Sequence, residues 1–556
     1  MRKPFRILTS LIVGCAVLTA PSARAQEIAS PVSDQLRLFL ESVPLPVELR
    51  LGGESVLAAQ ALPAFYAQRV YRPAWVSENG PMPAADQFLA VLKSVDDDGL
   101  RSQDYHLDRI SRLLETTSGS SPSPAALAEL DLLLTDACLM LGAHLVSGRV
   151  DPFDLDREWI AVRREIDLVA ALEAALETGE VRAFLESLLP DHQGYFLLRD
   201  LGRRYRDLVA AGGWPPISEG PALRLGDSGS RVAELRQRLA VTGDLEADDS
   251  DLTETLFDEQ LESAVRSFQA RHGLGVDGVV GERSLAALNV TASERLEQIY
   301  LNLERWRWLP QSLGEHYVLV NLPAFDLRVV DGEATVLEMR VAVGRRYRRT
   351  PVFSDTIRYL VFNPYWEIPP SIAINDKLPE IRKDPSYFGK QGIRVLSGWG
   401  ADQREIDPHT IDWSTLGRGN FPFRLRQDPG PLNALGRVKF MFPNSFNIYL
   451  HDTPGREVFD RPERDVSSGC IRVAKPLELA ELLLSYNEDW QPGSSRQFLS
   501  DYRERTIRLD VPWPVHLLYW TAWVDEQGKA QFRADLYNRD DKLSKALAEG
   551  SGSDGL

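Results

Sequence analysis

The sequence predicts a multidomain α+β protein with a helical N-terminal domain, a small three-helix unit and a mostly-β C-terminal domain. Three observations lead to this class. Apolar residues recur every three or four positions from about residue 30 to residue 212, which is typical of packed helices. A Gly- and Pro-rich linker, GGWPPISEGP, follows at 212–221. Beyond residue 313 the apolar period changes to two, which indicates strands.

Length and composition support several folded domains. A chain of 556 residues is too long for one hydrophobic core, and 44% hydrophobic with 26% charged residues is typical of folded proteins. The formal net charge of −17 argues against nucleic acid as a partner, because phosphates require a basic surface.

The first 25 residues are predicted to be a signal peptide. Basic residues precede an apolar run at 7–20, and small residues lead to a cleavage site after Ala25. The run is too short to span a bilayer comfortably. An alternative is a lipoprotein box, IVGC, which would leave Cys15 lipidated and anchored to a membrane. Either reading places the body of the protein outside the cytoplasm.

Three further boundaries follow from patterns along the chain. Residues 30–212 form the helical domain, and residues 221–290 form the three-helix unit. The central helix of that unit presents one buried face, made by Leu261, Ala264, Val265 and Phe268. A connecting helix at 291–312 leads onward and stops at Pro310.

The C-terminal domain is predicted at 313–540. Runs such as HYVLVNLPAFDLRVV and IRYLVFNPYWEI have strand composition. A segment at about 371–425 interrupts them and is expected to be an inserted cap of helix and irregular structure. We expect a flexible tail at 541–556.

Cys470 stands in SSGCIR, downstream of His451 in HDTPG. His451 ends a predicted strand, and Cys470 precedes an apparent helix start, where a thiolate is favoured electrostatically. Gly469 would allow its own amide and that of Cys470 to point at a developing oxyanion. These features favour a Cys–His acyl-transfer enzyme.

Three other roles for Cys470 stay open on these grounds. A lone cysteine before an amphipathic helix is commonly a packing residue. A disulfide with Cys138 is conceivable, although Cys138 lies in an apolar core-type helix. A metal site would need more ligands, for which Asp452 and Asp465 are candidates, but no compact zinc spacing exists. We therefore predict no metal and no cofactor.

HDTPG followed by SSGCIRV resembles the signature of the L,D-transpeptidase catalytic domain (YkuD type), which is a histidine followed by Ser-x-Gly-Cys-x-Arg. The commonest form has histidine directly before the glycine, where this chain has Ser468. A serine at this position fits the large YcbB-like periplasmic subgroup of the family. The segments FYAQRVYRPAW and DDDGLRSQDYHL also resemble segments of that subgroup. Residues 223–289 resemble the peptidoglycan-binding type 1 module.

The resemblance implies a helical scaffold domain, a peptidoglycan-binding module and a catalytic domain with a capping subdomain. It implies a periplasmic enzyme in which Cys470 is the nucleophile and His451 the general base and acid. The reaction would give 3→3 cross-links between peptidoglycan stem peptides. The partners implied are stem peptides, glycan strands and peptidoglycan synthases. Alternatives are L,D-carboxypeptidase trimming or a non-catalytic wall-binding scaffold.

Several neighbours of the pair are predicted to serve the site. Arg472 matches the motif arginine and would bind a substrate carboxylate or brace the loop. Ser467 and Ser468 could orient His451 or simply form the turn. Tyr449 and Trp366 would line the groove or pack within strands. The segment GRRYRRTP at 344–351, here called the arginine loop, would meet anionic peptides or form a solvated hairpin tip.

Overall fold

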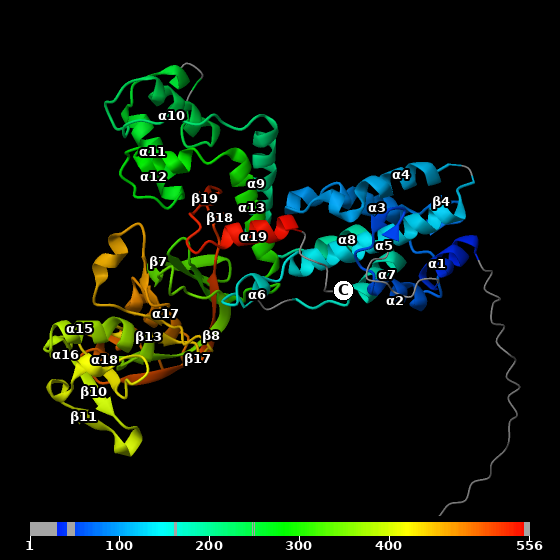
Figure 1. The fold of residues 1–556 in the computed structure, drawn as a ribbon. Helices are drawn as coiled ribbons and strands as arrows, with labels where there is room; N and C mark the ends of the chain where they lie inside the picture. Colours follow the sequence, from blue (N-terminus) through cyan, green and yellow to red (C-terminus); the bar gives the residue numbers. More distant parts are fainter. Residues whose placement is uncertain are drawn as a thin grey trace, which may run out of the picture.

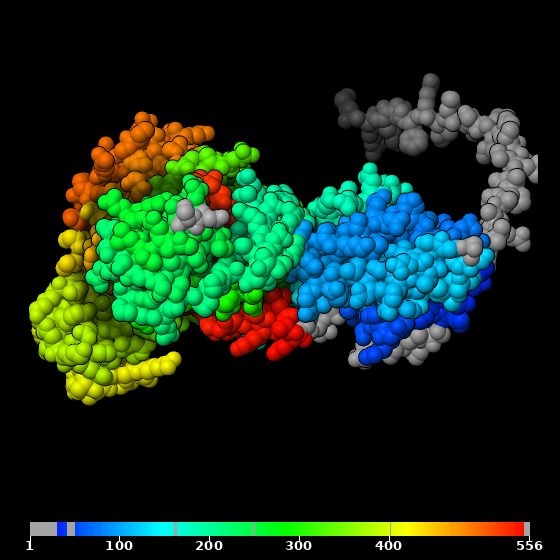
Figure 2. Space-filling model, turned by 90° about the horizontal axis from the view of Figure 1, so that it is seen from above, coloured from blue at the N-terminus to red at the C-terminus, as the bar shows by residue number. Residues whose placement is uncertain are grey.

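The computed structural model describes residues 30–41, 50–119, 121–160, 164–246, 248 and 251–549. The predicted signal peptide and Cys15 lie outside the described residues. Figures 1 and 2 show an elongated molecule, with the helical N-terminal domain at one end and the cap of the C-terminal domain at the other.

The helical domain is built around α5 (Pro124–Ser147), whose residues are mostly buried. Pro124 begins this helix, and Gly148 ends it with a φ of 78°. It is long and apolar enough to cross a membrane, but 83% of its most apolar window is buried inside the protein. It is contacted by α1 (Pro31–Glu41), α2 (Ala61–Gln68), α3 (Pro83–Leu92), α4 (Leu107–Thr117) and α7 (Leu168–Thr178). The domain also contains α6 (Pro152–Leu155), α8 (Val181–Ser187) and α9 (Gln193–Ala210), with the strand pairs β1 (Arg50–Leu51) with β2 (Glu54–Ser55) and β3 (Val76–Ser77) with β4 (Gly80–Pro81).

The three-helix unit follows the linker and contains α10 (Ser230–Val241), α11 (Glu259–Arg271) and α12 (Glu282–Leu288). Its core contains the predicted face of α11, namely Leu261, Ala264, Val265 and Phe268. The unit lies at one end of α9 and of the connecting helix α13 (Ala292–Arg307), which run beside each other in Figure 1. A capping box between Thr291 and Glu294 begins α13.

The C-terminal domain is a nine-stranded sheet in the order β15-β7-β16-β14-β13-β8-β17-β5-β6, which closes on itself because β6 also pairs with β7. Its apolar interior includes Val320, Leu360, Trp513 and Val515. The helices α17 (Pro476–Leu484) and α18 (Ser494–Phe498) pack against it. The strands are β5 (His316–Asn321), β6 (Asp326–Asp331), β7 (Ala334–Gly344), β8 (Phe353–Phe362), β13 (Val438–Met441), β14 (Leu450–His451), β15 (Asp465–Ser467), β16 (Ile471–Val473) and β17 (Arg505–Leu518).

The cap is more ordered than expected. It contains a four-stranded sheet, β11-β10-β12-β9, with a core that includes Phe388, Val395 and Trp413. Because β9 pairs with β12, the cap sheet reaches beyond the predicted limits of 371–425 at both ends. Its elements are β9 (Trp366–Ile368), α14 (Pro370–Ile372), the π-helix Ala373–Lys377, α15 (Leu378–Lys383), α16 (Tyr387–Lys390), β10 (Ile393–Ser397), β11 (Arg404–Ile406) and β12 (Arg424–Gln427).

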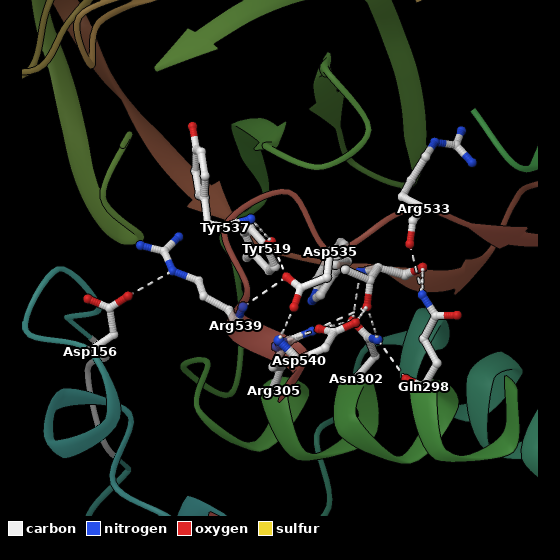
Figure 3. A network of polar contacts seen from close by, with 12 residues as sticks. Asp156, Gln298, Asn302, Arg305, Tyr519, Arg533, Asp535, Tyr537, Arg539 and Asp540 are labelled. Carbon is white, nitrogen blue, oxygen red and sulfur yellow. Dashed lines mark hydrogen bonds and ion pairs between the residues drawn. The ribbon is translucent and has the colours of Figure 1, made fainter. Parts of the chain in front are cut away.

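The C-terminal segment ties the domains together. The hairpin of β18 (Ala522–Val524) and β19 (Ala530–Phe532) lies against α9 and α13 and is followed by α19 (Arg539–Glu549). The prediction of a flexible tail is wrong for residues 541–549, because α19 buries Leu543 in the core of the C-terminal domain; residues 550–556 lie outside the described residues. Arg305 of α13 forms an ion pair with Asp540 at 2.6 Å (Figure 3).

Candidate active site

Five functional side chains lie on three neighbouring strands or directly before them. In β13, β14 and β16, Lys439 lies opposite His451, and His451 lies opposite Arg472. Opposed residues point to the same side of a sheet, and so do residues two apart in a strand. Tyr449 and Cys470 lie directly before β14 and β16, and the N–H of Ile471 donates to the carbonyl of Tyr449 at 3.1 Å. All five line one cavity of about 1440 Å³ that is also bordered by the cap and the arginine loop.

His451 is held in the tautomer that a general base requires. Its Nδ1 lies 2.6 Å from the backbone oxygen of Asp452, and because a carbonyl only accepts, Nδ1 carries the proton. Nε2 of the neutral ring is then free to accept a proton. Burial, with the positive charges of Arg472 and Lys439, lowers the pKa of His451 to about 3. The imidazole is therefore neutral near pH 7.

The orienting contact comes from an unexpected residue. Ser467 and Ser468 were the predicted candidates, but the backbone of Asp452 takes this role. The Asp452 carboxylate is itself fixed, because it accepts a hydrogen bond from the Arg437 N–H at 2.8 Å and another from Arg456 at 3.1 Å. The Ser468 hydroxyl lies instead 2.9 Å from Nη1 of Arg348, from which it accepts a hydrogen bond.

The Cys470 thiol is partly exposed in the cavity and is free, as is the buried thiol of Cys138. Burial raises the pKa of Cys470, although hydrogen bonds from Tyr449 and the charges of Lys439 and Arg472 act in the opposite direction. The thiol and the imidazole are therefore both neutral at rest. The predicted helix start is wrong, because Cys470 is followed by the strand β16 and α17 begins only at Pro476.

The loop before the nucleophile depends on Gly469, whose φ of 115° lies in a region that side chains rarely adopt. Its N–H donates to the Ser467 hydroxyl at 3.1 Å, and that hydroxyl donates to the Cys470 carbonyl at 2.5 Å. The Gly469 amide is therefore occupied, contrary to its predicted oxyanion role. The Cys470 N–H has no hydrogen-bond partner among the described residues and is the available oxyanion donor.

The walls of the cavity carry positive charge. Arg472 lines the cavity, and its buried Nε has no hydrogen-bond partner among the described residues. Arg345 and Arg346 also line the cavity. Sequence reasoning missed Lys439, whose ammonium lies 4.1 Å from the centre of the Tyr449 ring. The only signal was a lysine within the apolar run VKFMF.

Trp366 and Tyr449 both line the cavity, and both also pack in the core of the cap, so the two predicted alternatives hold together. Trp366 belongs to the first strand of the cap, and Lys377 lies 5.5 Å from the centre of its ring. In the described part of the chain, no group of three or more His, Cys, Asp or Glu side chains could hold a metal ion.

Comparison with family models identifies three domains. Residues 315–495 match the L,D-transpeptidase catalytic domain (YkuD), residues 60–201 match the Scaffold domain, and residues 228–288 match the putative peptidoglycan binding domain.

Two curated relatives match parts of the chain. A putative L,D-transpeptidase of Haemophilus influenzae is 35% identical over 250 residues, which are 45% of this chain and 49% of the relative. The N-acetylmuramoyl-L-alanine amidase CwlM of Mycobacterium tuberculosis is 46% identical over 88 residues, which are 15% of this chain and 21% of the relative. The chain thus spans about half, or less, of the length of these relatives.

Among solved structures, the L,D-transpeptidase (Yku) of Stackebrandtia nassauensis matches 55% of this chain and 96% of its own, with 14% identity and a TM-score of 0.21. The L,D-transpeptidase of Xylanimonas cellulosilytica matches 55% and 100%, with 15% identity and a TM-score of 0.17. Scores this low carry no argument about this chain.

Proposed function

Because residues 315–495 form an L,D-transpeptidase catalytic domain, we propose that the protein is a peptidoglycan L,D-transpeptidase that works through a thioester on Cys470. One observation supports this most directly. The neutral His451 ring is fixed by its Nδ1 contact at 2.6 Å, and it lines the same cavity as Cys470, which is large enough for a peptide.

In the first step, Sγ of Cys470 attacks the carbonyl of the third residue of a donor tetrapeptide stem. The thiol proton passes to Nε2 of His451 as the S–C bond forms, because neither group is ionised at rest. The Cys470 N–H donates to the oxyanion. His451 then gives its proton to the amine of the terminal D-Ala, and the C–N bond breaks.

In the second step, the side-chain amine of diaminopimelate on an acceptor stem attacks the thioester. His451 takes a proton from this amine, a C–N bond forms, and the sulfur of Cys470 leaves and is reprotonated. The product is a 3→3 cross-link. With water as the acceptor, the same thioester would give L,D-carboxypeptidase trimming.

The charges of the cavity suit an anionic peptide. Stem peptides carry several carboxylates, and Arg472, Lys439, Arg345 and Arg346 line the same cavity. Arg345 and Arg346 make no ion pair within the described part of the chain, and Arg472 has the unpartnered Nε. We assign Arg472 to a substrate carboxylate, because a guanidinium fork matches a carboxylate geometrically.

The setting of the reaction is part of the proposal. The predicted signal peptide or a lipid anchor at Cys15 would place the enzyme in the periplasm, where glycan strands and peptidoglycan synthases are its partners. The three-helix module at 228–288 would hold the polymer. A wall-binding protein that only uses the catalytic fold as a scaffold is the rival function.

Purified protein incubated with tetrapeptide muropeptides tests the proposal. We expect 3→3 dimers by mass spectrometry from the native chain and none from Cys470→Ala. His451→Ala should keep the fold and lose turnover. A carbapenem should add the mass of one molecule at Cys470. Dimers formed by Cys470→Ala would refute the nucleophile, and a native chain without any product would favour the wall-binding scaffold.

A further inference from the structure

The arginine loop contacts both the nucleophile and the scaffold domain. We propose that Thr350 in this loop and Asp156 in the scaffold domain are positioning residues for Cys470, so that the reactive geometry depends on the contact between the two domains. The inference rests on the proposed acyl transfer. Thr350 and Asp156 act through Cys470 and do not contact the substrate themselves.

Thr350 is the direct link to the nucleophile. Its buried hydroxyl donates to the carbonyl oxygen of Gly469 at 2.8 Å and accepts from the N–H of Gly344 at 2.9 Å. One hydroxyl thus joins the two ends of the arginine loop and fixes the peptide that precedes Cys470. A second contact, from the N–H of Arg345 to the carbonyl of Ser467 at 3.1 Å, runs beside it.

The fit around this link is tight. A Cβ atom on Gly469 would lie 3.2 Å from Cδ1 of Ile448 and 3.6 Å from the backbone oxygen of Arg349. Close-packed protein interiors transmit small displacements instead of absorbing them. A shift of the arginine loop therefore moves the Gly469–Cys470 peptide and the Cys470 N–H with it.

Two carboxylates of the scaffold domain, in a stretch at 156–160 here called the scaffold segment, hold the loop from the other side. Nη1 of Arg349 lies 3.0 Å from Asp156, and its Nε lies 2.9 Å from Glu158. The backbone adds two hydrogen bonds, from the N–H of Val352 to Glu158 and from the N–H of Ile160 to Val352, each at 2.8 Å. The scaffold segment thus pairs with the chain just beyond the arginine loop.

Asp156 also binds the C-terminal segment. Nε of Arg539 lies 3.1 Å from the same carboxylate (Figure 3). Burial acts to raise the pKa of Asp156, but Arg539, a backbone hydrogen bond and Arg349 outweigh it, so its pKa lies below the ordinary value. The carboxylate stays ionised and bridges two guanidinium groups that come from distant parts of the chain.

The scaffold segment itself is anchored. Trp159 is nearly buried and packs edge-to-face against Trp308 with the ring centres 5.0 Å apart. Its ring also lies 5.5 Å from the guanidinium carbon of Arg539. The packing of Trp159 therefore holds Asp156 and Glu158 in place beside the arginine loop.

Near-isosteric variants of the full chain test the proposal. Thr350→Val removes only the hydroxyl, and Asp156→Asn removes only the charge. Each should lower the single-turnover rate of thioester formation on Cys470 about tenfold or more, and by a larger factor than any rise in KM for the tetrapeptide, because misplacement of a reacting group costs mainly rate. Thr350→Ser, which keeps the hydroxyl, should restore most of the rate.

Asp97→Asn is the matched control. Asp97 is a scaffold carboxylate that also pairs with two arginines, Arg203 at 2.8 Å and Arg206, and among the described residues it makes no contact with the loop at 467–470. The Asp97→Asn variant should lower the thermal midpoint about as much as Asp156→Asn does. Its rate of thioester formation should stay within about twofold of that of the native chain.

A second readout separates this inference from the proposed function. Alkylation of Cys470 by iodoacetamide needs no peptide substrate, and its rate should change at least threefold in Thr350→Val and Asp156→Asn but not in Asp97→Asn. If the native chain forms no thioester but these alkylation rates differ, the proposed function fails and the positioning role stands. The positioning role would be overturned if Thr350→Val and Asp156→Asn both kept the native thioester and alkylation rates. It would also be overturned if Asp97→Asn lost as much rate as they do.

Discussion

The resting state of the Cys470–His451 pair leads to a prediction about thiol reactivity. Burial raises the pKa of Cys470 above its ordinary value, and the pKa of His451 is lowered to about 3. An ordinary thiol with a pKa near 8.5 is about 3% thiolate at pH 7, so Cys470 should be less ionised than that. The pair then differs from a thiolate–imidazolium ion pair, which is fully reactive in mild acid.

The assay is iodoacetamide alkylation of Cys470 between pH 5 and pH 10, followed by site-resolved mass spectrometry. We expect a rate at pH 7 below about 3% of the high-pH rate and a rise that continues above pH 9. His451→Asn should leave this profile unchanged, because a neutral imidazole does not stabilise a thiolate. Cys138 is buried with a raised pKa and should not react.

Half-maximal alkylation at or below pH 7 would refute this reasoning. So would a large upward shift of the midpoint in His451→Asn, since both results require an imidazolium beside a thiolate. The proton would then have moved before substrate binds, and the first step of the proposed mechanism would have to start from the ion pair.

Three further predictions concern the walls of the site. Gly469→Ala should lose about 1–3 kcal/mol of unfolding free energy in urea titration, because alanine is strained at a φ of 115°; native stability would contradict the loop geometry. Arg472→Gln should raise KM for the tetrapeptide about tenfold without lowering the thermal midpoint, and an unchanged KM would exclude the carboxylate contact. Lys439→Met should slow alkylation of Cys470 at pH 8, because a cation that favours the thiolate is lost; a faster rate would contradict its placement.

Local sequence patterns were sufficient to predict the regular elements of the structure. The spacing of Leu261, Val265 and Phe268 predicted the buried face of α11, and the structure confirms it. The Cys470–His451 pair was predicted from a strand end, a glycine and, decisively, the resemblance of HDTPG and SSGCIRV to the catalytic signature, and both side chains line one cavity. These features depend on neighbours in the sequence, which a single chain displays directly.

The features that the sequence did not predict, which are the cap sheet, the orienting contact of Asp452 and the C-terminal helix, depend on contacts that leave no local sequence pattern. The strands of the cap are three to five residues long, so their pairing cannot be read from their own composition. The role of Asp452 was missed because a backbone carbonyl leaves no side-chain signal. The tail was predicted to be flexible because the burial of Leu543 comes from the core of a domain that begins more than 200 residues earlier.

Strand β17 is the last of the nine sheet strands along the chain but lies between β8 and β5, inside the closed sheet. During synthesis the ribosome therefore releases the nucleophile well before the strand that completes the barrel. A chain truncated before residue 505 would contain His451 and Cys470 but lack a central strand of the sheet that carries them. The catalytic sheet therefore cannot close without β17, and products truncated before residue 505 should be inert.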